Sequence, residues 1–265
     1  MAKSKLNFEG QRVLITGSAG GIGTAIAEAF HDSGAELYLH YNKSKEGAEK
    51  LALKLQTRIH LVHANLSNEI EVEKMFSGFP SLNHVIANAG YYNSTSASIH
   101  EMSLSQWNET IDHNLTASFL TARSFFQNIK KFKTISPSLV MIGSTAGIFG
   151  EKGHADYASA KAAIMSGLLP TLKNEIARLS PLGRVNVVAP GWTVTPMAEK
   201  FLEDKQAVKK SLQTFAMTKL AKPEDVAGSV LYLCSDLAGH VSGEILKVTG
   251  GMEGRILWEK EEISL

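Results

Sequence analysis

The feature that most constrains the fold is a glycine-rich turn between an expected first strand and an expected first helix. Residues 12–16 are apolar and β-branched, and residues 22–33 repeat apolar side chains at helical spacing. The turn between them contains Gly17, Gly20, Gly21 and Gly23. Such glycines let the backbone approach a pyrophosphate, while the N-terminus of the helix offers unpaired N–H groups to it. No Lys-Ser or Lys-Thr pair follows the glycines, so this is not the loop of a nucleotide-hydrolysing enzyme.

Short apolar runs and helical segments alternate along the rest of the chain. Strands are expected at residues 12–16, 36–40, 59–63, 84–87, 138–142, 184–188 and 244–248. Helices are expected at residues 22–33, 47–55, 105–132, 155–179 and 224–234, with a kink at Pro170. This alternation predicts an α/β fold with a doubly wound, seven-stranded parallel sheet of the Rossmann type.

We expect one domain spanning residues 1–265, because no Pro, Gly or Ser-rich break divides the chain. Residues 192–221 follow a strand end and are long and mixed in charge, so we expect them to form a lid over the substrate. Residues 252–265 are expected to form a C-terminal extension.

The composition excludes several other classes of protein. The 27 basic and 26 acidic residues give a net charge of +1, which disfavours nucleic acid as a partner. Cys234 is the single cysteine, so neither an intrachain disulfide nor a cysteine-based zinc cluster can form, and the scattered histidines predict no metal site. The first ten residues lack the apolar core of a secretory signal, and no apolar run approaches the ~18 residues of a membrane span. We expect a cytoplasmic protein without a membrane partner.

Four polar residues are candidates for acid–base chemistry. Tyr157 and Lys161 are four residues apart near the start of an expected helix, so their side chains share one face. Ser144 follows the fifth expected strand, and Asn114 lies in the preceding long helix. Hydride transfer to a carbonyl builds an alkoxide that must be protonated. A tyrosine hydroxyl can supply that proton, and a nearby ammonium favours the phenolate and so lowers the tyrosine pKa from about 10.

These features together resemble the short-chain dehydrogenase/reductase family over essentially the whole chain. The matching motifs are TGxxxGxG at residues 16–23, Asn88-Ala89-Gly90, Asn186 with Pro190-Gly191, and Thr249-Gly250-Gly251. The resemblance implies an oxidoreductase that transfers a hydride between a nicotinamide cofactor and a ketone or secondary alcohol. Within the family the chain looks most like the 3-oxoacyl-carrier-protein reductases and glucose-type dehydrogenases, so a 3-oxoacyl thioester is a candidate substrate.

The resemblance also assigns roles to individual residues. It implies a catalytic tetrad of Asn114, Ser144, Tyr157 and Lys161. Lys161 would lower the pKa of Tyr157 and bind the nicotinamide ribose, and Ser144 would donate to the substrate oxygen. Asn114 would hold a water molecule that links Lys161 to solvent. The long helices 105–132 and 155–179 would build a subunit interface, which implies a homotetramer, with a dimer as the second choice.

The end of the second expected strand bears on the choice of cofactor. It carries no carboxylate to hold a ribose 2′-hydroxyl, whereas Lys43 and Ser44 could bind a 2′-phosphate. We therefore expect NADP, with NAD as the alternative. The expected cofactor contacts are Gly17, Ser18, Ala19, Gly20, Gly21, Ile22, Gly23, Tyr41, Asn42, Lys43, Ser44, Asn65, Leu66, Asn88, Ala89, Gly90, Tyr157, Lys161, Pro190, Gly191, Thr193 and Thr195. Asn65 is expected to accept from the adenine amine.

Two other functions stay open at this point. The chain could be an NAD-dependent alcohol or sugar dehydrogenase. It could also be a non-catalytic regulator that binds a dinucleotide on the same fold without turnover. The physiological substrate, the direction of the reaction and its stereochemistry do not follow from the sequence.

Overall fold

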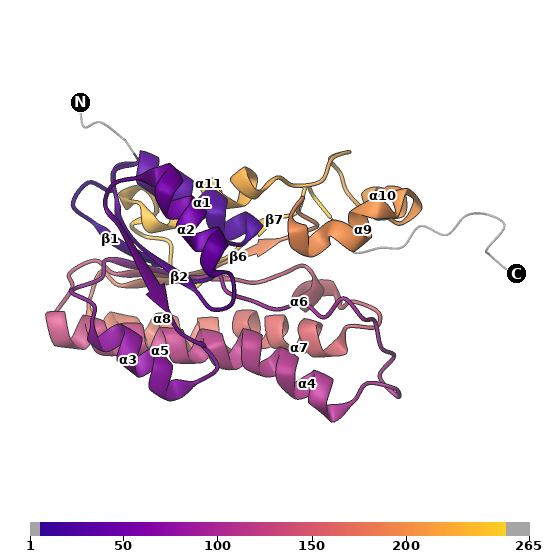
Figure 1. Ribbon diagram of the computed structural model, residues 1–265, viewed down its shortest axis with the longest axis horizontal. Helices are drawn as coiled ribbons and strands as arrows, with labels where there is room; N and C mark the ends of the chain where they lie inside the picture. Colours follow the sequence, from indigo (N-terminus) through magenta and orange to yellow (C-terminus); the bar gives the residue numbers. More distant parts are fainter. Residues whose placement is uncertain (1–5, 253–265) are drawn as a thin grey trace, which may run out of the picture.

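A computed structural model describes residues 6–252, and in them one parallel sheet forms the centre of the molecule (Figure 1). The strand order is β3-β2-β1-β4-β5-β6-β7. The strands are β1 (Arg12–Ile15), β2 (Glu36–Tyr41), β3 (Ile59–His63), β4 (His84–Ala87), β5 (Ser138–Ile142), β6 (Arg184–Pro190) and β7 (Ile245–Val248). Every expected strand is confirmed to within two residues at either end, as is the Rossmann-type α/β fold.

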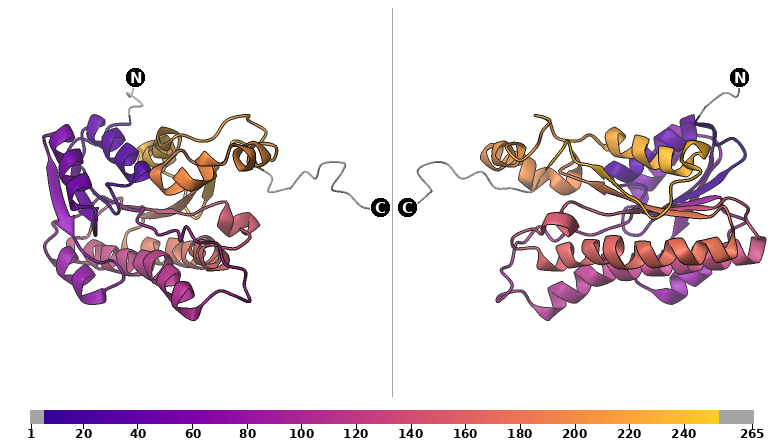
Figure 2. Two further views of the ribbon diagram at one scale, coloured as in Figure 1. Left: turned by 45° about the vertical axis from the view of Figure 1, so that its right-hand side comes forward. Right: turned by 180° about the vertical axis from the view of Figure 1, so that it is seen from behind.

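Helices cover both faces of the sheet (Figures 1 and 2). One layer contains α1 (Gly21–Asp32), α2 (Lys45–Leu55) and α11 (Pro223–Cys234). The other contains α3 (Glu69–Ser77), α4 (Leu104–Ile111), α5 (Ala117–Phe132), α7 (Ala155–Ala163) and α8 (Leu169–Leu179). The short helix α6 (Ala146–Phe149) leads into α7.

Successive side chains along each strand point to opposite faces of the sheet, which divides the core into two parts. Val13 and Ile15 of β1 pack with Phe30 of α1 on one face of the sheet. Leu14 points to the opposite face and joins the cluster that contains Phe125 of α5. Because both faces are buried, the central strands carry apolar residues at successive positions, which explains the runs seen in the sequence.

The two long helices expected from the sequence each contain a π-helical turn. Asp112–Thr116 joins α4 to α5, and Ile164–Leu168 joins α7 to α8. Where the sequence predicts a kink at Pro170, the structure has a π-helical turn that ends just before the proline. Such turns occur preferentially at functional sites, and the first of them contains Asn114.

Helix α3 was not expected, because glutamates alternate with apolar residues over positions 69–73 and obscure the helical spacing. The side chain of Asn68 caps it by accepting from the backbone N–H of Glu71 at 3.3 Å. Val72 and Phe76, four residues apart, bury the only face that packs on the core. The asparagine followed by an acid three residues later was a signal for this helix that the apolar periodicity alone did not give.

The expected lid segment stands apart from the sheet at one end of the molecule (Figure 2). It contains a short 3-10 turn at Pro196–Ala198, followed by α9 (Glu199–Glu203) and α10 (Lys205–Leu212). The expected C-terminal extension, apart from Met252, lies outside the described residues. Between residues 6 and 252, no helix has the length and apolar character needed to cross a membrane.

Candidate active site

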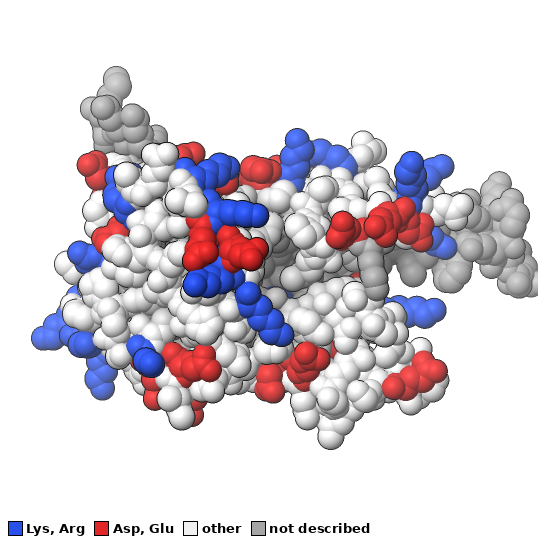
Figure 3. Space-filling model, in the orientation of Figure 1, with Lys and Arg blue, Asp and Glu red and all other residues white. Residues whose placement is uncertain are grey.

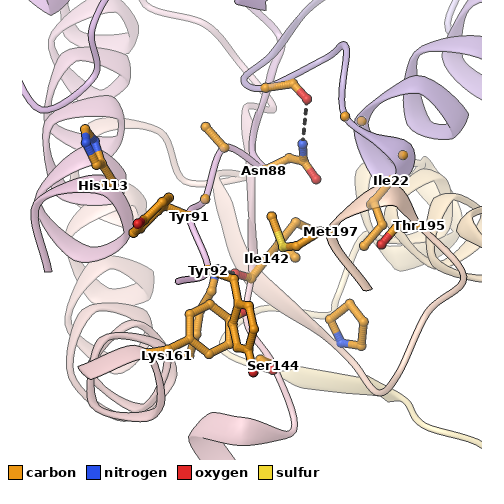
Figure 4. A pocket seen from close by; sticks show the side chains of 18 of the residues that line it. Ile22, Asn88, Tyr91, Tyr92, His113, Ile142, Ser144, Lys161, Thr195 and Met197 are labelled. Carbon is orange, nitrogen blue, oxygen red and sulfur yellow. Dashed lines mark hydrogen bonds between the residues drawn. The ribbon is translucent and has the colours of Figure 1, made fainter. Parts of the chain in front are cut away.

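A cavity of about 630 Å³ opens where the strands β1, β2, β4, β5 and β6 end. Ligands bind at this carboxyl edge in doubly wound sheets, and the volume lies in the usual range of ligand sites. Figure 4 shows Ile22 and Thr195 on one side of the cavity and Ser144, Lys161 and Tyr92 together on another. The cavity is lined by every site residue expected from the sequence except Ser18 and Asn114.

Close packing around the glycine turn explains why glycines are needed there. A Cβ atom on Gly23 would lie 2.2 Å from the backbone oxygen of Gly17, and one on Gly21 would lie 2.8 Å from Cγ2 of Thr195. Gly17 itself has a φ of +62° and lies against the backbone of Ala89. No side chain caps the N-terminus of α1, so the N–H groups of its first turn are available to an anion. The turn therefore fits the pyrophosphate of a dinucleotide.

Asn88 fastens the glycine turn to the end of β4. Its side-chain amide donates to the backbone oxygens of Thr16 at 2.9 Å and Gly17 at 3.1 Å. Figure 4 shows a hydrogen bond from this amide as a dashed line. The Thr16 hydroxyl oxygen accepts from the backbone N–H groups of Asn88 and Ala89, both at 2.9 Å. The polar atoms of Asn88 thus hold the turn in shape.

His40 supports the turn from the other side. Its Nδ1 accepts from the Gly17 N–H at 3.1 Å, and its Nε2 lies 2.9 Å from the backbone oxygen of Ala64, to which it donates. Burial lowers the pKa of His40 to about 4, so the ring is neutral at physiological pH and can make both bonds.

Ser18, which the sequence places among the cofactor contacts, does not line the cavity. Its hydroxyl donates to the backbone oxygen of His40 at 3.1 Å, and its side chain is fully buried away from the cavity. The hydroxyl of a serine in this turn can donate a hydrogen bond either to a ligand or to the backbone of the neighbouring strand. Here the end of β2 is close enough to take both its hydroxyl and its N–H.

Three of the four tetrad residues come together at the cavity. Lys161 is buried and donates from Nζ to the backbone oxygen of Ile142 at 2.9 Å. The same Nζ lies 5.6 Å from the centre of the Tyr157 ring. Ser144 follows β5, and its hydroxyl oxygen accepts from the Ala146 N–H at 3.1 Å. The Ser144 hydroxyl also forms a hydrogen bond with Tyr157. Tyr157, Ser144 and Lys161 all line the cavity.

Burial shifts the pKa values of both Tyr157 and Lys161. Burial raises the pKa of Tyr157 to about 12, with the Ser144 hydroxyl opposing this rise and the Glu151 carboxylate adding to it. Burial lowers the pKa of Lys161 to about 8. In the polypeptide alone, the effect of burial on the Tyr157 pKa is thus larger than the opposing effect of Ser144. The lowering of the tyrosine pKa by Lys161 stays a prediction.

Asn114 acts on the backbone beside the cavity. Its amide nitrogen donates to the backbone oxygen of Tyr91 at 2.7 Å, and its Oδ1 accepts from the Tyr91 N–H at 3.2 Å. A Cβ on Gly90 would lie 3.0 Å from Asn114 Oδ1 and 3.4 Å from Lys161 Nζ. Asn114 therefore fixes the segment that follows β4, immediately beside Lys161. The water-holding role that the resemblance implies stays a prediction.

The far end of the cavity holds the residues expected near the adenine ribose. Tyr41, Asn42, Lys43 and Ser44 all line it, as do Asn65 and Leu66. Asn65 Oδ1, expected to accept from an adenine amine, accepts from the Ser67 N–H at 3.1 Å. That bond forms because the chain turns directly after Asn65, which brings the amide two residues on within reach of the side chain.

Several lining residues were not expected from the sequence, most notably Tyr91, Tyr92, Glu151 and Met197. Tyr91 and Tyr92 follow a strand end, which was a usable signal. Glu151 and Met197 lie in loops whose path depends on tertiary packing, so neither spacing nor periodicity identifies them.

Comparisons with known proteins agree with this geometry. The family model described as enoyl-(acyl carrier protein) reductase matches residues 17–253. The chain is 33% identical over 256 residues to the 3-oxoacyl-(acyl-carrier-protein) reductase FabG of Aquifex aeolicus, covering 94% of this chain and 99% of that one.

The chain is also similar to two solved structures. The first is a short-chain dehydrogenase/reductase, glucose/ribitol dehydrogenase, from Brucella melitensis, with a TM-score of 0.83, 32% identity and coverage of 93% of this chain and 98% of that one. The second is a putative NAD(P)-dependent gluconate 5-dehydrogenase from Beutenbergia cavernae with bound NADP, with a TM-score of 0.85, 28% identity and the same coverage.

Proposed function

The chain belongs to the short-chain dehydrogenase/reductase family as an NAD(P)-dependent oxidoreductase acting on CH–OH or C=O groups, and we propose that it reduces a ketone with NADPH or runs the reverse reaction. The observation that carries this proposal is the meeting of Tyr157, Ser144 and Lys161 at the cavity that the glycine turn also lines. A bound nicotinamide cofactor supplies or accepts the hydride.

The side chains at the cavity would supply a proton to the substrate oxygen and stabilise the negative charge that develops on it. Because the pKa of Tyr157 is raised to about 12, its hydroxyl carries a proton at neutral pH and can give it to a substrate oxygen that becomes an alkoxide. The Ser144 hydroxyl would donate a hydrogen bond to that same oxygen. Lys161 has two ammonium protons left beyond its bond to Ile142, and these could reach a ribose hydroxyl.

The proposed preference for NADP rests on the end of β2. Tyr41 ends the strand, and Lys43 and Ser44 follow where an acidic residue would exclude a 2′-phosphate. The similar protein from Beutenbergia cavernae is described with bound NADP. NAD is the alternative, because Gly20 stands where many NADP-binding relatives are expected to carry a basic residue.

The substrate is proposed as a class. The Aquifex relative is named for a 3-oxoacyl thioester, and the two structural relatives are named for sugar or sugar-acid dehydrogenation. NADPH consumption with an acetoacetyl thioester, set against NADP reduction with glucose, distinguishes these two directions. Cofactor binding without turnover on any carbonyl or alcohol would instead favour a non-catalytic, dinucleotide-binding protein.

We also propose a homotetramer. Phe119 of α5 is 44% exposed and Leu179 of α8 is 36% exposed, and they line a shallow cavity with Phe126 and Leu172 between the two helices. Such an apolar face fits a helix pair of a second subunit. Light scattering would give the mass of four chains if this is right and of two or one if it is not.

On the face shown in Figure 3, acidic and basic side chains are interspersed, as expected for a protein that does not bind nucleic acid. A cytoplasmic location stays a prediction.

A further inference from the structure

A carboxylate lies in the same cavity as the proposed proton donor. Glu151 is in the loop between α6 and α7, and it lines the cavity together with Tyr92, Ser144 and Tyr157. The Tyr92 hydroxyl donates to Oε1 of Glu151 at 2.8 Å. In Figure 4 the side chain of Tyr92 lies beside Ser144. The carboxylate is therefore held at the side of the cavity where the proposed chemistry takes place.

Aromatic packing fixes the position of Tyr92. Its ring meets the Tyr157 ring edge-on, with centroids 5.1 Å apart and planes at 88°. Its other contact is a stack on His154, with centroids 4.5 Å apart and planes at 27°. A side chain packed against two rings loses little further freedom when it donates a hydrogen bond. Tyr92 thus holds Glu151 in a defined place relative to Tyr157.

The carboxylate keeps capacity for a ligand. A carboxylate offers about four acceptor positions on its two oxygens, and the single hydroxyl of Tyr92 can fill only one of them. Burial raises the pKa of Glu151, while the bond from Tyr92 and the neighbouring His154 oppose that rise. Its charge also contributes to the raised pKa of Tyr157, so Glu151 is close enough to act on the groups around the reacting oxygen.

This arrangement does not match a plain acyl chain. The carbons beside the keto group of such a chain carry no hydrogen-bond donor, so they would cover Glu151 without replacing the water they displace. Leaving a buried acceptor unpaired is unfavourable, the more so for a charged group. An anionic group on the substrate would be repelled at the same place.

We propose that Glu151, held by Tyr92, determines substrate specificity by accepting a hydrogen bond from a hydroxyl group of a neutral, hydroxylated ketone or of the corresponding polyol. This inference rests on the proposed oxidoreductase function and narrows its substrate class. Glu151 would recognise the substrate, and the proton would still come from Tyr157.

The test compares ketones that differ only in the donor. NADPH consumption is followed for hydroxyacetone and methoxyacetone, and for a ketone with the hydroxyl one carbon further away and its methyl ether. The wild-type protein should prefer at least one hydroxyketone over its ether by about tenfold or more in kcat/KM, as expected for a hydrogen bond to a charged group. Glu151→Gln should shrink this ratio, and Glu151→Leu should abolish it. Lys152→Gln, an exposed change in the same loop, should keep the ratio.

Tyr92→Phe provides a second variant that keeps the ring packing and removes only the donor to Glu151. It should lower the preference partly while NADPH affinity is unchanged, and it decides the matter if the Glu151 variants do not fold. The inference is overturned if the wild-type protein reduces ketones but never favours the hydroxyl compound over its ether, or if the preference survives in Glu151→Leu. Failure to reduce any ketone despite NADPH binding would instead refute the proposed function, and this inference would fall with it.

Discussion

The Nζ atom of Lys161 lies 5.6 Å from the centre of the Tyr157 ring, one helical turn along α7. Burial lowers the pKa of Lys161 to about 8, so its charge is lost as the pH rises through that value, while Tyr157, with a pKa of about 12, stays protonated. We predict that kcat/KM for ketone reduction falls above pH 8, since that parameter reports the free protein. A profile that stays flat to pH 10 would show that the ammonium charge is not needed.

His40 should couple the stability of the glycine turn to pH. Its folded pKa of about 4 lies below the unfolded value of about 6.5, so the unfolded chain binds more protons between these two values. Stability is then fully present above pH 6.5 and falls as the pH drops towards 4, by about 3 kcal/mol in total. Burial also lowers the pKa of His84, to about 3, so urea unfolding between pH 7 and 4 measures the His40 contribution as the difference between the wild-type protein and His40→Ala.

The variant His40→Ala should remove part of that pH dependence and weaken NADPH binding. It leaves the Gly17 N–H and the Ala64 oxygen without their partner, which should cost about 2 kcal/mol or more at neutral pH. His100→Ala, in an exposed loop, serves as the control and should change neither stability nor affinity. Equal behaviour of the two variants would contradict a supporting role for His40.

Gly23→Ala should disrupt the cofactor cradle. The new Cβ would lie 2.2 Å from the backbone oxygen of Gly17, so the turn must shift, and we expect NADPH affinity to fall at least tenfold. Gly228→Ala in α11 has open space around its Cβ and should instead stabilise the protein by up to about 1 kcal/mol. Fluorescence titration with NADPH and thermal unfolding measure both effects, and unchanged NADPH binding in Gly23→Ala would refute the tight packing.

Lys43→Ala should weaken NADPH binding selectively. Lys43 is exposed at the cavity, so we expect a modest rise in the NADPH Kd, roughly threefold to tenfold, and no change for NADH. Lys50→Ala, on the exposed side of α2, should alter neither value. If Lys43→Ala weakens both cofactors alike, the lysine does not recognise the 2′-phosphate.

The sequence predicts most of the fold because its signals are local. The central strands are buried on both faces, so their apolar runs stand out, and the glycine turn is recognisable because Gly17 and Gly23 have no room for a side chain. The i, i+4 spacing of Tyr157 and Lys161 likewise places both on one helix face. Helix α3 escaped prediction because its acidic residues obscure the two apolar positions that bury it.

Non-local features of the site could not be predicted. The turn of Ser18 towards His40 depends on where β2 ends relative to β1, and the stacking of Tyr92 on His154 joins two loops distant in the sequence. The raised pKa of Tyr157 depends on how deeply the packed cavity removes it from water. Such properties arise from tertiary packing, which neither spacing nor composition records.

The most direct test of the proposed chemistry is single-turnover ketone reduction by Tyr157→Phe with NADPH already bound. This variant keeps the ring that Tyr92 packs against and removes the hydroxyl group that carries the proton. We predict an NADPH Kd within about twofold of the wild-type value and a reduction rate lowered by about 10²-fold to 10⁴-fold. A rate close to that of the wild-type protein would contradict the assignment of Tyr157 as the proton donor.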